Sequence, residues 1–405
     1  MSRSPRLPRL VWFACVLPPM IAASAIGTSH AAAIRVVGDG RELGETPLLL
    51  EWKTPLDPGV YQLRNREDGS SIPAQAFRDR GKTYLGLILD HVPARGPLVF
   101  DGPIAGTAGD GDSVELVQHG ARVDVRIGGK ALTTYVPDDG PKPYFFPLVG
   151  PAGSAVTRAF PMQKVEGEKY DHPHHRSLWF THGSVNKVDF WSELAGHGTI
   201  KETARPTLIS GPVVGLLRTT DDWIGPDGKK VCEDERATWI YATKAARILD
   251  FEVVIKATTG PLTFGDTKEG MFGVRVATSM DVTSNLGGKI LNAEGVADKA
   301  AWGKASPWVD YSGPVAGKTA GVAILNHPES FRYPTTWHVR DYGLFAANPF
   351  GWHDFGMKES GEHTIPAGGS LRFRYRVILH AGEAASAHLD AAFQGYSRPP
   401  AVMIE

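Results

Sequence analysis

Cysteine is scarce in this chain of 405 residues, which contains only Cys15 and Cys232. Cys15 lies in the apolar N-terminal segment, so we expect Cys232 to stand alone in the rest of the chain. An intrachain disulfide is then excluded, and a hydrophobic core must supply the stability. Cys232 lies between Val231 and Glu233 in a segment that favours a strand, and we expect a packed, unreactive thiol there.

An excess of charge of either sign is also missing. The 43 lysines and arginines nearly balance the 44 aspartates and glutamates, for a net charge of −1. This balance argues against the basic surface that nucleic-acid binding needs, so we expect no nucleic-acid partner. Beyond residue 33 no apolar run is long enough to span a bilayer, so we also expect no membrane span in the mature chain.

The first 33 residues have the features of a secretory signal. Three arginines within the first nine residues precede a mostly apolar stretch, residues 10–26, and small residues follow at 29–33. We interpret residues 1–33 as a cleaved signal peptide, which predicts a periplasmic or secreted protein. An uncleaved membrane anchor is the alternative, although Pro18 and Pro19 interrupt the apolar stretch.

Turn-forming residues are abundant, with 46 glycines and 30 prolines spread along the chain without a repeat. The clearest strand pattern is residues 371–380, where Arg372, Arg374 and Arg376 alternate with apolar side chains. Only residues 383–394 have good helical character. The sequence therefore predicts an all-β protein: a small N-terminal β domain at residues 34–136, followed by a large antiparallel β-sandwich at residues 137–405 that carries the site.

Histidine is concentrated in one segment, residues 171–193, which reads DHPHHRSLWFTHGSVNKVDFWSE. Four of the 14 histidines lie between His172 and His182. A strand beginning at His174 would place His174, Arg176 and His182 on one face, with His175 and Trp179 on the other. Imidazoles gathered in this way serve as metal ligands or as proton carriers near neutral pH.

Three interpretations of this segment stay open. A divalent metal needs several converging imidazoles, and His172, His175 and His338 are the candidates, although no H-E-x-x-H zinc motif is present. Metal-free acid–base chemistry needs one imidazole and a cation that holds substrate oxygens. A buried polar network without catalytic activity is the third possibility.

Two further segments carry the same residue types. In residues 265–276, Lys268 and Glu269 precede an apparent strand that contains Arg275, and the nearby cations should keep the carboxylate ionised. In residues 331–353, alternation places His338, Arg340 and Tyr342 on one face. Aromatic rings interleaved with arginine and asparagine suit carbohydrate, because rings stack on sugars and forked donors bind hydroxyls.

Four motifs together resemble the PmoA-like bacterial family of unknown function. They are KPYFFPLVGPAGSAVTR (142–158), DHPHHRSLWFTHG (171–183), GDTKEGMFGVR (265–275) and WHVRDYGLFAANPFG (337–351). The resemblance covers roughly residues 140–382 and implies a secreted or periplasmic protein of sugar catabolism. Methane oxidation, which the family's name suggests, would require spanning helices that this sequence lacks. The chain has a weaker similarity in fold to aldose-epimerase-like β-sandwich proteins.

We therefore expect a secreted carbohydrate-active enzyme that cleaves or isomerises a glycoside, with a keto-glycoside as one possible substrate. The alternatives are a sugar-binding protein without catalysis and a structural domain. The partner is a small-molecule or oligosaccharide substrate, and the one possible cofactor is a divalent metal. The candidates are His174, His182, Glu269, Arg176 and Arg340 for catalysis; Trp179, Asp189, Lys268, Arg275, Tyr342, Asn348 and Trp352 for substrate binding; and His172, His175 and His338 for the metal.

Overall fold

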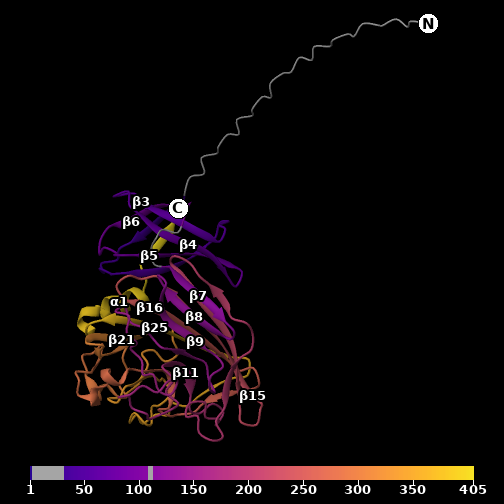
Figure 1. The fold of residues 1–405 in the computed structure, drawn as a ribbon, viewed down its shortest axis with the longest axis vertical. Coiled ribbons are helices and arrows are strands. Elements are labelled where there is room, and N and C mark those ends of the chain that lie inside the picture. The colour runs from indigo at the N-terminus through magenta and orange to yellow at the C-terminus, as the bar shows by residue number, and fades with distance from the viewer. Residues whose placement is uncertain (2–31, 108–112) are drawn as a thin grey trace. The chain divides into compact units, whose positions relative to one another are not determined.

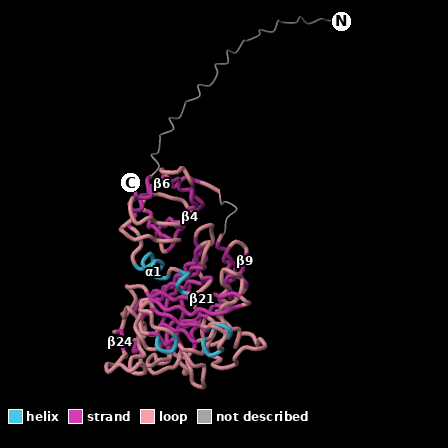
Figure 2. The backbone as a smooth tube through the Cα atoms, turned by 90° about the vertical axis from the view of Figure 1, so that its left-hand side faces the viewer, coloured by secondary structure: helices cyan, strands magenta, loops and turns pink. Residues whose placement is uncertain are grey.

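A computed structural model describes residue 1, residues 32–107 and residues 113–405. The predicted signal peptide lies almost wholly outside these residues. Strands make up 49% of the structure and helices 6%, which confirms the all-β prediction (Figures 1 and 2). None of the helices in the described ranges is long and apolar enough to cross a membrane.

The first sheet has seven antiparallel strands in the order β2-β5-β4-β3-β6-β1-β26. Its strands are β1 (Ala33–Val37), β2 (Thr46–Trp52), β3 (Gly59–Asn65), β4 (Ser71–Asp79), β5 (Lys82–Leu89), β6 (Pro97–Ala105) and β26 (Ala401–Ile404). The C-terminal strand β26 pairs with β1, so the two ends of the described chain complete one sheet.

The second sheet has eight strands in the order β22-β23-β18-β11-β10-β9-β8-β7. Its strands are β7 (Val114–His119), β8 (Arg122–Ile127), β9 (Lys130–Val136), β10 (Tyr144–Phe146), β11 (Leu178–His182), β18 (Gly270–Arg275), β22 (Trp337–Val339) and β23 (Leu344–Ala347). We expected the segment that forms β7 to β9 to belong to the N-terminal domain, but β9 pairs with β10, and β8 and β7 follow it in the same sheet of the sandwich.

The third sheet has nine strands, with β13 paired to β14 beside the main order β12-β14-β15-β16-β25-β21-β20-β19. Its strands are β12 (Thr199–Glu202), β13 (Thr207–Ile209), β14 (Val214–Ile224), β15 (Lys230–Tyr241), β16 (Arg247–Lys256), β19 (Lys289–Asn292), β20 (Trp308–Val315), β21 (Lys318–Asn326) and β25 (Ser370–Ala381). Strands β17 (Leu262–Phe264) and β24 (His363–Ile365) form a separate pair.

Helices are few and short. They are the 3₁₀ helices η1 (Thr278–Met280), η2 (Val282–Ser284), η3 (Asp298–Ala301) and η4 (Ala384–Ala387), and the α-helix α1 (Leu389–Ser397). The helix expected at 383–394 is divided between η4 and α1, because His388 between them has a φ of +48°.

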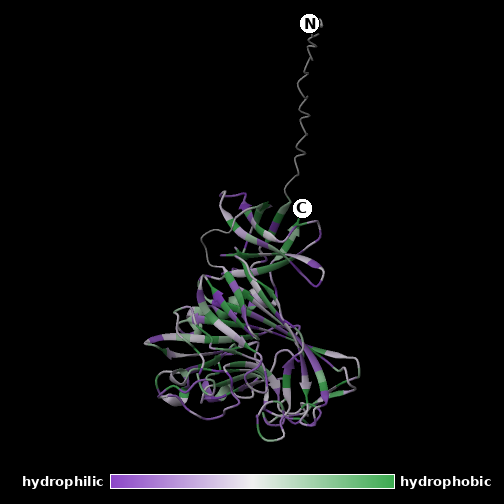
Figure 3. Cartoon of the chain, turned by 45° about the vertical axis from the view of Figure 1, so that its right-hand side comes forward, coloured by the Kyte–Doolittle hydropathy of each residue, from purple (hydrophilic) through white to green (hydrophobic). Residues whose placement is uncertain are grey.

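The main core lies between the second and third sheets, as in a β-sandwich. Its aromatic contacts cross from one sheet to the other: Phe272 on β18 stacks on Tyr375 on β25 with ring centroids 4.7 Å apart, and Phe180 lies 5.6 Å from Phe373. Hydrophobic and hydrophilic residues alternate along the strands (Figure 3). On β25 this alternation places Phe373, Tyr375 and Val377 in the core, as the sequence predicted.

Cys232 is fully buried in β15, opposite Trp223 of β14. Burial raises the pKa of its thiol well above the ordinary range. The thiol is therefore packed and protonated, as expected from the sequence.

Two carboxylates lie side by side in the third sheet. Asp221 of β14 pairs with Asp234 of β15, and both are fully buried. They share one guanidinium, because Arg236 lies 2.7 Å from Asp234 and 3.4 Å from Asp221. Burial and the neighbouring Asp234 outweigh Arg236 and raise the pKa of Asp221 to about 7.

This raised pKa predicts a pH-dependent stability. An ordinary aspartate in the unfolded chain titrates near pH 4 (about 3.9), so between about pH 4 and pH 7 the folded state holds a proton that the unfolded state releases. The contribution of Asp221 to stability is complete below about pH 4 and is lost as the pH rises through 7.

The amide of Asp221→Asn has no proton to release, so the variant avoids the loss of stability that wild type suffers as the pH rises. The free energy of unfolding of the variant minus that of wild type should therefore increase by about 1–3 kcal/mol between pH 5 and pH 8. One proton contributes at most about 1.4 kcal/mol per pH unit. Urea unfolding of both proteins at pH 5, 6.5 and 8 measures the difference. Asp57→Asn, at a side chain that is 95% exposed, is the control. An unchanged difference across this pH range would refute the assignment.

Candidate functional site

The candidate site lies on the face of the second sheet that points away from the main core. Trp337 and Val339 of β22 enter the core, so His338 between them points to the opposite face. A smaller apolar cluster covers that face and includes Trp179, Leu344 and the loop residue Trp191. The sheet thus has a core face and a second, polar and aromatic face, and the alternation of side chains along its strands decides which of them reach each face.

The histidine segment forms a strand only from Leu178, so the predicted strand from His174 is wrong. Pro173 lies in a turn, and His172 and Ser177 have φ values of +43° and +58°, which break the expected alternation. His182 consequently points into the main core beside Phe264 and Phe350. The predicted common face of His174, Arg176 and His182 therefore does not form.

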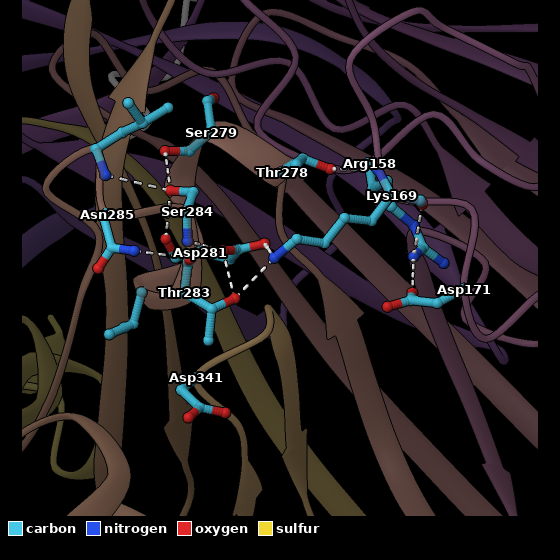
Figure 4. A network of polar contacts seen from close by, with 12 residues as sticks. Arg158, Lys169, Asp171, Thr278, Ser279, Asp281, Thr283, Ser284, Asn285 and Asp341 are labelled. Atoms are coloured by element: carbon cyan, nitrogen blue, oxygen red, sulfur yellow. Dashed lines mark hydrogen bonds and ion pairs between the residues drawn. The ribbon is translucent and has the colours of Figure 1, made fainter.

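One carboxylate anchors the loop that carries the histidines. Oδ1 of Asp171 accepts from Nη1 of Arg158 (Figure 4). The same oxygen accepts from Nη2 of Arg275 at 2.7 Å. Both guanidiniums are buried, and Arg158 also donates to the backbone oxygen of His172 at 3.1 Å. Burial alone would raise the pKa of Asp171, but the two arginines outweigh it and lower the pKa.

A second ion pair extends this anchor toward η2. Nζ of Lys169 lies 2.8 Å from Oδ2 of Asp281 and 2.7 Å from the Thr283 hydroxyl (Figure 4). Asp281 is buried and caps η2 by accepting from the backbone N–H of Ser284 at 2.6 Å. The loop at 169–172 is therefore tied to the sandwich at two neighbouring points.

Three rings stack beside the anchor. His172 lies between His175 and Tyr342, with ring centroids 4.9 Å and 5.0 Å away and interplanar angles of 10° and 7°. His175 stacks in turn on Trp179 at 5.4 Å. Nδ1 of His172 lies 3.2 Å from Oδ1 of Asp171, although the two atoms are not aligned as a hydrogen bond.

The turn between β22 and β23 carries Arg340 and Tyr342. The N–H of Gly343 donates to the oxygen of Arg340 at 3.0 Å, and Gly343 has the positive φ of +99° that this turn needs. The buried Tyr311 hydroxyl contacts the backbone oxygens of Arg340 and Asp341 at 3.2 and 3.0 Å, close enough to donate to either. The backbone beneath the two side chains is thus held firmly.

The guanidinium of Arg340 lies between two aromatic rings. It is 5.8 Å from the ring of Trp302 and 5.3 Å from that of Tyr342. Neither this guanidinium nor the Tyr342 hydroxyl has a hydrogen-bond partner among the side chains and backbone that the structure describes. Both groups are therefore available to a ligand.

His338 has one nitrogen committed and one free. Nε1 of Trp302 donates to Nδ1 of His338 at 3.1 Å, and an indole N–H can only donate. Burial, then the charges of Arg340, Lys268 and His172, lower the pKa of His338 to about 3. The imidazole is therefore neutral at physiological pH, with its proton on Nε2, and it can donate one hydrogen bond.

Glu269 is the carboxylate of this group. Its side chain is about one-third exposed, and its Oε1 lies 3.1 Å from Nζ of Lys268. Its charge adds to the effect of burial in raising the pKa of Tyr342. Glu269 thus acts on Tyr342 through its charge, whereas His338, Arg340 and Tyr342 are linked by direct contacts with Trp302 or with one another.

His174 lies on the loop beside His172 and His175. Burial, then the charges of Lys142 and His172, lower its pKa to about 4. Its ring lies edge-on to His175 at 4.5 Å and makes no hydrogen bond to any described residue. It is therefore neutral at pH 7 and can accept or donate a single hydrogen bond.

Other predicted residues serve the fold instead. Arg176 forms a two-fold ion pair with Glu193 at 2.8 and 2.9 Å, and the buried Lys142 binds the same carboxylate at 2.8 Å. Asp189 accepts from the backbone of Trp191 at 2.7 Å. These contacts fix the conformation of the loop over the site. They also occupy the hydrogen-bonding groups of Arg176 and Asp189.

The last three predicted residues also have structural contacts. Nε2 of His182 contacts the oxygen of Gly265 at 2.8 Å, and the side chain of Asn348 donates to the oxygen of Thr267 at 3.0 Å. Trp352 lies under the guanidinium of Arg332 at 4.2 Å. None of the three contacts the group around Tyr342.

The proposed metal ligands offer few free lone pairs. Nδ1 of His175 accepts from Arg275 at 3.0 Å, and Nδ1 of His338 accepts from Trp302, so each neutral ring carries its proton on Nε2. Within residues 32–107 and 113–405, no group of three His, Cys, Asp or Glu side chains is placed to hold a metal. The donor set therefore does not fit a site built from His172, His175 and His338.

Several residues of the site were not predicted as site residues. Asp171 is the first residue of the histidine segment, and Arg158 is the last residue of the motif at 142–158. Both could therefore have been identified from the sequence. No sequence pattern indicated Trp302, because it lies outside every motif. Its contact with His338 depends on the position of η3, which it directly follows. Glu193 and Lys142 were visible as charges, but their pairing depends on the fold.

The contrast between Arg176 and Arg340 gives a test. Arg176→Met should lower the free energy of unfolding by about 3 kcal/mol, because it leaves the buried Glu193 with one partner fewer. Arg340→Met should lower it by about 1 kcal/mol or less, since only stacking on aromatic rings is lost. Urea unfolding compares the two variants, and equal losses would contradict the division into structural and available arginines.

Comparison with known proteins gives a family but no activity. No curated protein matches the chain. Residues 122–394, which are more than half of the chain, match the model of DUF6807, described as a family of unknown function. The match confirms a family of unknown function over the sandwich, whereas the PmoA-like family and the similarity to aldose-epimerase-like proteins stay predictions. The chain therefore belongs to the DUF6807 family.

Proposed function

We propose that this protein is a secreted or periplasmic carbohydrate-active enzyme that cleaves or isomerises a glycoside, with a keto-glycoside as the favoured substrate. The observation that carries the proposal is one set of neighbouring groups without partners in the described chain. It comprises the Arg340 guanidinium, the Tyr342 hydroxyl and Nε2 of His338, and the charge of the Glu269 carboxylate acts on Tyr342.

Aromatic faces beside these groups suit a sugar ring. Trp302 and Tyr342 flank Arg340, and His172 and Tyr342 stack face to face. Rings of this kind cover the apolar C–H face of a sugar, while forked and hydroxyl donors bind its oxygens. The four motifs that resemble a sugar-related bacterial family lie around the same groups.

The chemistry assigned to each group follows from its charge state. Glu269 is partly exposed and is the group that can take a proton from a carbon next to a ketone. The Tyr342 hydroxyl and the neutral His338, which donates through Nε2, can stabilise the oxyanion that then develops. Arg340 positions the sugar. His182, buried in the core, has no part in this scheme.

A sugar-binding protein without catalysis is the second candidate, and one observation favours it. The pKa values of His174 and His338, lowered to about 4 and about 3, make both rings poor proton carriers at neutral pH. If Glu269 also takes no proton, the same groups would only bind.

Product analysis separates the two candidates. The purified protein is incubated with a panel of glycosides and their 3-keto forms, and products are followed by mass spectrometry. Glu269→Gln should lower kcat by about 10²–10⁴-fold without changing the melting temperature, because it removes the base but keeps the shape.

Tyr342→Phe should also lower kcat, by a smaller factor, since only one donor is lost. Glu67→Gln, at an exposed carboxylate between β3 and β4 of the first sheet, is the matched control. A ligand-induced rise in melting temperature without any product would favour the binding protein. Full activity in Glu269→Gln would rule out its assignment as the base.

A further inference from the structure

Arg340 differs from the other arginines that are at least partly buried. In the described part of the chain, each of the others donates to a carboxylate or to a backbone oxygen. Arg176 binds Glu193, Arg376 binds Asp250 at 2.6 Å, and even Arg332 binds the oxygen of Pro349 at 3.0 Å. Arg340 has neither kind of acceptor.

The position of this guanidinium is nevertheless well defined. The Arg340–Gly343 turn is held by its own hydrogen bond and by Tyr311, and the rings of Trp302 and Tyr342 flank the charged group. Such preorganisation is costly for a cation that only points into water, because side-chain freedom is lost without a compensating bond. The arrangement suits a ligand that brings the missing acceptor.

A cavity adjoins the guanidinium. Its volume is about 300 Å³, and it is lined by Lys299, Trp302, Val339, Arg340 and Asp341. This volume is at the lower end of the range for small-molecule sites and fits about one sugar unit. An aromatic wall, a free guanidinium and a lysine thus face one space.

Positive charge exceeds negative charge around the site. Two buried guanidiniums, Arg158 and Arg275, share the single carboxylate of Asp171. Glu269 is matched by Lys268, and in the cavity lining the two cations Lys299 and Arg340 outnumber the one carboxylate, Asp341, which forms no ion pair with Arg340. An anionic ligand would neutralise this excess of positive charge, whereas a neutral sugar would leave it unchanged.

We infer that the sugar bound at this site carries a carboxylate, as in a uronic acid, and that Arg340 binds this carboxylate. The inference rests on the proposed function and names its substrate class. A planar carboxylate matches the guanidinium fork with two parallel hydrogen bonds, which a hydroxyl group cannot do. Trp302 and Tyr342 then hold the guanidinium in place and shield the ion pair from water.

Binding measurements with matched sugars test this inference. The probes are methyl glucuronide and methyl galacturonide, the corresponding neutral methyl glucoside and galactoside, and their 6-sulfates. Titration calorimetry at constant ionic strength should give the uronides a Kd about 10- to 100-fold lower than that of the neutral sugars, as expected for charge-assisted hydrogen bonds.

Arg340→Gln should remove this preference and leave the melting temperature unchanged. Arg340→Lys should restore it in part, because the charge returns without the fork. Arg126→Gln, at an exposed arginine of β8, should keep the full preference. A preference that survives in Arg340→Gln would overturn the assignment of Arg340.

The remaining outcomes separate this inference from the proposed function. Equal Kd values for uronides and neutral sugars would overturn the inference and leave a carbohydrate site in place. Tighter binding of the 6-sulfates than of the uronides would overturn the assignment of a carboxylate ligand and would assign the site to sulfated sugars. Binding of none of the probes would contradict both the inference and the proposed function.

Discussion

The site depends on the ion pairs that the carboxylate of Asp171 forms with two buried arginines. Asp171 joins the loop residue Arg158 to Arg275 on strand β18, and through Arg275 the same contact reaches His175 and Tyr342. Losing the carboxylate would leave two buried cations facing each other, which is far more costly than losing a surface pair. The loop therefore cannot move away from the sheet without a large loss of stability, and the rings stacked on it keep their positions.

Burial, more than any single charge, decides the electrostatics of the histidines. Buried imidazoles among cations lose their protons, and the pKa values of His174 and His338 fall far below neutrality. A cluster that suggests proton transfer in the sequence thus becomes, in the folded chain, a set of neutral hydrogen-bonding rings. In the function proposed above, the proton chemistry is therefore assigned to Glu269, whose carboxylate is partly exposed and has Lys268 beside it.

The sequence was sufficient to predict the fold class, but it did not predict correctly which side chains of the site share a face. Alternation in residues 371–380 identified β25 and its core side chains correctly, because a strand buried on one face imposes a period of two. The same rule failed at 172–182, where positive φ values at His172 and Ser177 break the strand before Leu178. Around β22 the rule held again, since Trp337 and Val339 are buried and His338 faces away. Alternation therefore predicts faces only within an unbroken strand.

Residue type alone could not separate the arginines that have an acceptor in the fold from Arg340, which has none among the described residues. Arg176 and Arg340 looked equivalent in the sequence, yet one meets Glu193 and the other meets only aromatic rings. Glu193 is 17 residues from Arg176 and has no fixed spacing to it that a pattern could reveal. A cation acts as a binding group when the fold brings it no acceptor, so its role depends on all of its neighbours. This property can be read only from the folded chain, and it marks Arg340 as the residue that most directly connects the architecture to a ligand.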